Sequence, residues 1–142
     1  MDETAPVLDD ISEMDWPSPP EVIPGWAIEE ALAWRNLDDF GLLAKAEEVC
    51  GRSVELFQVP LPGSLWGLHV ARGSRVRIYV NRCLPLIWKR FAFFHELYHL
   101  LHHKKGESFW TATATPMTSF EHQADMFAWA AILNDWSEGG EW

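Results

Sequence analysis

The sequence has few cysteines and few basic residues, and it lacks long apolar runs. Only two of its 142 residues are cysteines, Cys50 and Cys83, too few for a disulfide framework and typical of a reducing compartment. The longest apolar run, 126–133, has eight residues, far short of the roughly 20 that cross a bilayer. The first 34 residues contain no Lys or Arg and no apolar core of a signal peptide. We therefore expect a cytoplasmic protein without membrane spans.

The charge is strongly acidic and unevenly distributed. Eleven basic and 21 acidic residues give a net charge of −10, which argues against nucleic acid or an anionic membrane as a direct partner. Residues 51–110 nevertheless hold nine of the basic side chains, whereas residues 1–24 hold seven acidic residues and five prolines. We predict that residues 1–24 form a flexible arm that solubilises the chain or lies across its basic middle. The single domain is then 25–136, with a short tail at 137–142.

Hydrophobic periodicity predicts an α+β domain with a small three-stranded sheet. One helix begins near Ala27, with Ile28, Ala31 and Leu32 on its apolar face, and Gly51 is the stop signal of a second. Strand patterns follow, the last two joined as a hairpin, and two longer helices flank a polar loop. The ranges are 37–49 for the second helix, 54–59, 65–70 and 75–80 for the strands, 85–103 and 118–134 for the longer helices, and 107–117 for the loop. Four of the nine tryptophans lie in periodic segments and are expected in the core: Trp34, Trp66, Trp88 and Trp129.

The strongest chemical signal is the HExxH motif His95-Glu96-Leu97-Tyr98-His99, in the helix predicted at 85–103. Residues four apart on a helix lie one above the other, so His95 and His99 can bind one zinc ion. Glu96 can then take a proton from a water molecule at that ion. The alternative is a pair of surface histidines favoured by the dipole of a helix C-terminus. The apolar residues around the motif favour a buried helix and hence a metal site.

A catalytic zinc ion needs a third protein ligand. A histidine ten residues after the first is excluded, because that position is Lys105. The following helix offers Glu121 as a ligand, and Asp125, four residues further on, can accept a hydrogen bond from a ligating histidine. A second interpretation remains open, because Thr118 and Glu121 also match a capping box, in which Glu121 satisfies a backbone N–H.

Together these motifs resemble the ImmA/IrrE-type metallopeptidases of bacteria and their mobile elements. The resemblance covers about residues 37–134 and is carried by three stretches, Ile78–Asn81, Lys89–His102 and Glu121–Leu133. Two positions differ from the usual pattern. Tyr98 replaces the glycine of HELGH and adds bulk within the motif, and Asn134-Asp135 stands where many members have Met-Pro.

The resemblance implies a zincin-like fold, with zinc held by His95, His99 and Glu121 and with Glu96 as general base. It also implies a prophage or stress-response protease whose target is a separate helix-turn-helix repressor. Mn²⁺ or Fe²⁺ could use the same ligands. We therefore expect a metallo-endopeptidase, and the alternative is an interaction protein, an anti-repressor or toxin-type regulator, that uses the same fold without cleaving its partner.

Residues that bind the substrate or partner are less clearly marked. An extended substrate usually pairs with an edge strand through backbone hydrogen bonds, and we take the strand at 75–80 as that edge. The candidate binding residues are Arg75, Arg77, Tyr79, Tyr98 and His122. The three on the strand belong to the basic region, which suits an acidic substrate or partner.

Overall fold

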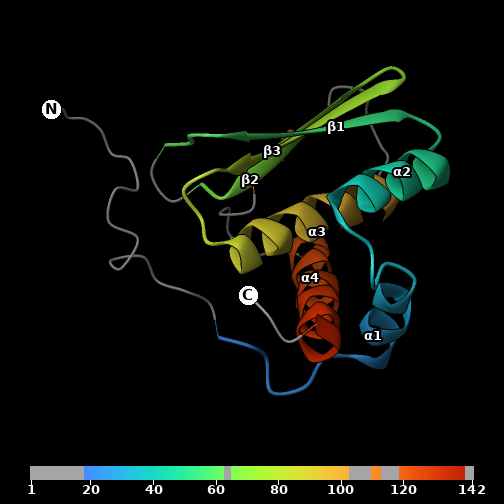
Figure 1. Ribbon diagram of the computed structural model, residues 1–142, viewed down its shortest axis with the longest axis vertical. Helices are drawn as coiled ribbons and strands as arrows, with labels where there is room; N and C mark the ends of the chain where they lie inside the picture. The colour runs from blue at the N-terminus through green and yellow to red at the C-terminus, as the bar shows by residue number, and fades with distance from the viewer. Residues whose placement is uncertain (1–17, 63–64, 103–109, 113–118, 140–142) are drawn as a thin grey trace, which may run out of the picture.

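The computed structural model describes residues 18–62, 65–102, 110–112 and 119–139. The fold is α+β, as predicted, with four helices and a four-stranded sheet. In chain order the elements are α1 (Gly25–Leu32), α2 (Asp39–Cys50), β1 (Ser53–Val59), β2 (Gly67–Arg72), β3 (Arg75–Asn81), α3 (Leu86–His102), β4 (Trp110–Ala112) and α4 (Ser119–Gly139). The helices lie on one side of the sheet, with α4 crossing α3 (Figure 1). Most of the predicted arm lies outside the described residues.

The sheet has the strand order β1-β3-β2-β4. β2 and β3 form the predicted antiparallel hairpin, and β1 pairs with β3 in parallel. The prediction that 75–80 is an edge strand is therefore wrong, because β3 has a neighbour on each side. Among the described strands, β1 and β4 form the edges. β4 is a short addition within the segment predicted as the loop 107–117, and it pairs with β2.

Local signals explain where several elements begin and end. The carboxylate of Asp38 accepts a hydrogen bond from the Gly41 N–H at 2.8 Å and caps the start of α2. Gly51 ends α2 with φ of 72°, and Gly73 turns the β2–β3 hairpin with φ of 61°; glycine adopts this left-handed conformation most readily. α4 extends five residues beyond the predicted end at 134, because no Gly or Pro interrupts it before Gly139.

The core lies between the sheet and α3, and α4 packs across the other side of α3. Alternate residues of β3 point inward, and all three are fully buried: Val76, Ile78 and Val80. The four tryptophans expected in the core are there, with Trp34 and Trp129 buried and Trp66 and Trp88 partly buried. The predicted apolar face of α1 is correct for Ala31, which is buried, but wrong for Ile28 and Leu32, which are 44% and 41% exposed. The second buried residue of α1 is Ala27, and the two alanines allow α1 to approach α4 closely.

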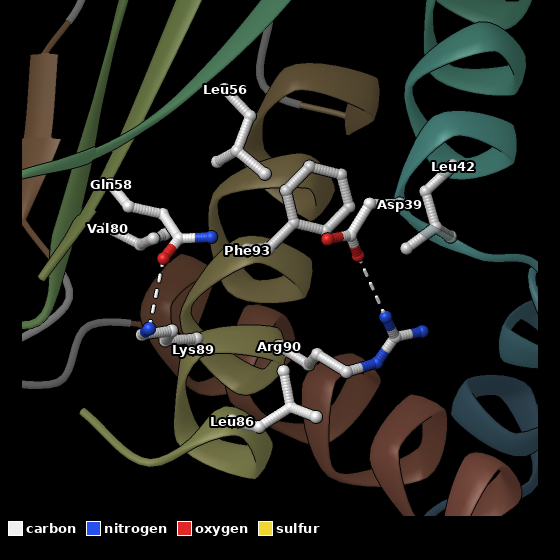
Figure 2. A pocket seen from close by; sticks show the side chains of 9 residues that line it. All are labelled: Asp39, Leu42, Leu56, Gln58, Val80, Leu86, Lys89, Arg90 and Phe93. Atoms are coloured by element: carbon white, nitrogen blue, oxygen red, sulfur yellow. Dashed lines mark hydrogen bonds and ion pairs between the residues drawn. The ribbon is translucent and has the colours of Figure 1, made fainter. Parts of the chain in front are cut away.

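Two polar bridges fix α3 against its neighbours, and both border a small pocket (Figure 2). The Lys89 ammonium donates to Gln58 Oε1 of β1 at 2.9 Å, and the Arg90 guanidinium donates to Asp39 Oδ1 of α2 at 3.1 Å. Phe93 lies between them. Since a helix turns about 200° in two residues, a helix held with Phe93 toward this pocket directs His95 to its opposite face. Among the described residues, no helix is long and apolar enough to span a membrane.

Candidate metal centre

Three of the residues named from the sequence converge in the interior. His95 and His99 project from α3, and Glu121 comes from the first turn of α4. Glu121 Oε1 lies 2.8 Å from His95 Nε2 and 3.3 Å from His99 Nε2. All three side chains are buried, and their possible ligand atoms lie within 4.8 Å of one another. Two imidazole nitrogens and a carboxylate oxygen in this arrangement could hold a metal ion.

Asp125 fixes the ring of His95 from its far side. One turn beyond Glu121 on α4, its Oδ1 accepts a hydrogen bond from His95 Nδ1 at 2.6 Å. A proton held on Nδ1 leaves the Nε2 lone pair available toward His99 and Glu121. Thr118, the other half of the possible capping box, lies outside the described residues, and the Glu121 carboxylate faces the two histidines.

Hydrogen bonds shift the pKa values of two members of the cluster in opposite directions. Burial alone would lower the pKa of His95, but hydrogen bonds to Asp125 and Glu121 outweigh burial and raise it to about 9. Burial would likewise raise the pKa of Glu121, yet the hydrogen bonds from His95 and His99 lower it to about 2. At neutral pH the metal-free site therefore holds a protonated His95 beside an ionised Glu121.

Binding of a divalent cation is expected to release about one proton at neutral pH, because the ion needs the Nε2 lone pair that is protonated on His95 below its pKa. The affinity for the ion should accordingly fall as the pH decreases below about 9. Calorimetric titration of the metal-free protein with Zn²⁺, in two buffers of different ionisation enthalpy, measures the protons released. Equal binding heats in the two buffers would contradict this protonation state.

Glu96 is also buried, and its carboxylate meets a residue that the sequence analysis did not single out. Glu96 Oε1 lies 2.7 Å from His69 Nδ1 on β2. The other oxygen, Oε2, is buried and has no hydrogen-bond partner within the described part of the chain. A signal for His69 was present: Gly67, His69 and Ala71 share the inward face of β2, so a polar side chain had to be buried there and needed a partner.

None of the five candidate binding residues belongs to the converging group of His95, His99 and Glu121. Arg75, Arg77 and Tyr79 alternate with the inward residues of β3 and so occupy the outer face of the sheet, opposite α3. Tyr98 is buried, and its ring centroid lies 5.8 Å from that of Trp26 on α1 and 5.3 Å from that of Phe127 on α4. His122 is exposed on α4. Their roles in binding stay predictions.

Comparison with known proteins adds one finding. The family model of the IrrE N-terminal-like domain, Peptidase_M78, matches residues 54–135. This range runs from β1 into α4, and it includes His69, the HExxH motif, Glu121 and Asp125. No curated protein and no solved structure matches the chain.

Proposed function

The chain belongs to the peptidase family of IrrE N-terminal-like domains, and we propose that it is a zinc-dependent metallo-endopeptidase. One observation carries the proposal: two histidines of α3 and a glutamate of α4 converge, and the buried carboxylate of Glu96 lies close enough to act on the charge of His95. A set of three ligands with an acidic residue alongside is the composition of a catalytic metal site, because a purely structural zinc site is closed by four protein ligands.

The residues present fit a zinc ion. Zinc accepts imidazole nitrogen together with carboxylate oxygen, and both kinds of donor are supplied here by buried side chains. A buried carboxylate oxygen without a protein partner is costly, and Glu96 Oε2 is such an atom within the described residues. A water molecule at the ion would give this oxygen the partner it lacks.

In this mechanism each protein group has one task. A divalent cation bound there would supply Lewis acidity toward a water molecule and the peptide carbonyl. His95, His99 and Glu121 would hold the ion, and the hydrogen bond from His95 Nδ1 to Asp125 keeps the His95 ring in position for it. Glu96 accepts a proton from the attacking water on its Oε2 atom and later delivers that proton to the leaving amine.

Elemental analysis of the purified full chain, followed by incubation with a proteome-derived peptide library, tests this function. We expect about one equivalent of zinc and cleavage products that disappear after treatment with a chelator. If the elemental analysis found Mn²⁺ or Fe²⁺ in place of zinc, the proposed metal would be wrong and the proposed peptidase activity would stand. A metal-loaded chain that cleaves no peptide would favour the non-cleaving regulator, above all if the wild type and Glu96→Ala inactivate a partner equally.

For the substrate, we propose a regulatory protein of the repressor type, as the family resemblance implies. The outer face of the sheet is suited to docking an acidic part of it. The side chains of Arg75 and Arg77 are 63% and 48% exposed, and Glu55 pairs with them at 3.8 and 3.4 Å. Tyr79 stacks on Phe57, with ring centroids 5.4 Å apart. Because this face lies opposite the metal centre, it would bind the partner away from the scissile bond.

Replacing both Arg75 and Arg77 by glutamine is expected to raise KM for peptides that carry acidic residues far from the cleaved bond, with kcat unchanged. The library assay measures this preference at low and at moderate salt, since the attraction is screened by salt. Arg82→Gln is the control, because Arg82 is exposed in the same basic region but does not line the shallow pocket that Arg75, Arg77 and Tyr79 border on the outer face of the sheet. A uniform change across all peptides would contradict docking on this face.

A further inference from the structure

The contact between His69 and Glu96 joins two elements that are distant in the sequence. His69 is 1% exposed on β2, and Glu96 is fully buried on α3. The ring of His69 also lies roughly parallel to that of His99, with centroids 6.2 Å apart. His69 therefore reaches the edge of the metal centre as well as the carboxylate beside it.

The two oxygens of Glu96 have different surroundings. Oε1 lies at hydrogen-bond distance from His69 Nδ1, whereas Oε2 is buried without a partner within the described part of the chain. A glutamate side chain has three rotatable bonds, and a proton acceptor must keep one oxygen in a defined position to be effective. Holding Oε1 from the sheet leaves Oε2 as the oxygen that can meet a water molecule.

We propose that His69 is a positioning residue for Glu96. Its Nδ1–H donates to Oε1 and holds the carboxylate with Oε2 toward the cluster of His95, His99 and Glu121. The inference rests on the proposed peptidase function and assigns a second element, β2, to its active site. The proposal therefore depends on the register of β2 against β3, because a slip of one residue would turn His69 to the outer face of the sheet.

Two substitutions of similar size separate positioning from packing. Asn Nδ2 stands as many bonds from Cβ as His Nδ1, so His69→Asn retains a donor, whereas His69→Leu does not. We expect His69→Leu to lower kcat about 10- to 100-fold with little change in KM. His69→Asn should stay within a few-fold of the wild type, and zinc affinity should be nearly the same in both variants. Equal loss of kcat in the two variants would overturn the proposal.

A second measurement is independent of activity and needs no change at His69. ¹⁵N NMR of the full chain, with and without zinc, reports which ring nitrogen carries the proton. We expect Nδ1–H in the wild type and the Nε2–H form in Glu96→Ala, where the acceptor is missing. An Nε2–H form in the wild type would overturn the proposal. Failure of the peptidase function would appear instead as a wild type that cleaves nothing, and the NMR result would still decide whether His69 holds the carboxylate.

Discussion

Replacing Glu96 by glutamine is expected to lower kcat for peptide hydrolysis roughly 10²- to 10⁴-fold, the usual contribution of general acid–base catalysis. The amide oxygen of glutamine can still accept the hydrogen bond from His69, so the side chain keeps its position. Its other terminal atom is an NH₂ group, which cannot take a proton from water. The loss should therefore appear in kcat and leave zinc binding intact.

The measurement is single-turnover cleavage of a peptide identified in the library, combined with zinc content and thermal unfolding of the same sample. Glu48→Gln is the control, because Glu48 is exposed on α2 and the substitution is chemically the same. A Glu96→Gln variant that retains zinc and cleaves at the wild-type rate would exclude Glu96 as the general base. Loss of zinc along with activity would assign to Glu96 a role in holding the ion.

The double variant Glu96→Gln/His69→Leu tests whether His69 acts through Glu96. If His69 acts only through the carboxylate, its replacement should cost little further activity once Glu96 can no longer accept a proton. Additive losses would mean that His69 contributes to the reaction by a separate route.

The elements that sequence analysis predicted well have local causes. Helices α2, α3 and α4 carry caps or a helical apolar period, and the β2–β3 hairpin is marked by its glycine turn. The HExxH spacing places two imidazoles on one helix face whatever surrounds the helix. Glu121 could be named because its partner Asp125 repeats the same four-residue spacing on the next helix.

The features that were missed depend on contacts between distant segments. The parallel pairing of β1 with β3 leaves no local mark, so β3 resembled an edge strand. On α1, Ala31 was placed correctly on the buried side, but Ile28 and Leu32 are exposed because α4 packs closely against the alanines. His69 was overlooked for the same reason, since its partner lies 27 residues away on another element.

Removing the Glu121 carboxylate is expected to have the second large effect, on metal binding. Structural zinc sites, which have four protein ligands, bind the ion with about 10–16 kcal/mol in total. Each ligand therefore contributes about 2.5–4 kcal/mol, which corresponds to roughly 10²- to 10³-fold in affinity. Glu121→Ala should lose about that much. Asp125→Ala, which removes only the group that orients His95, should lose about 10- to 100-fold. Gln123→Ala is the control on the same helix, because Gln123 is exposed.

Thermal unfolding with and without a chelator tests the role of Glu121 in zinc binding and needs no substrate. A ligand present at a thousand times its Kd stabilises the folded state by about 4 kcal/mol, so the wild type and Gln123→Ala should lose stability when zinc is withdrawn. Glu121→Ala should respond little, because it binds little zinc at the start. If the chelator destabilised Glu121→Ala as much as the wild type, the ion would be held without this carboxylate. The histidine pair would then need a different third ligand.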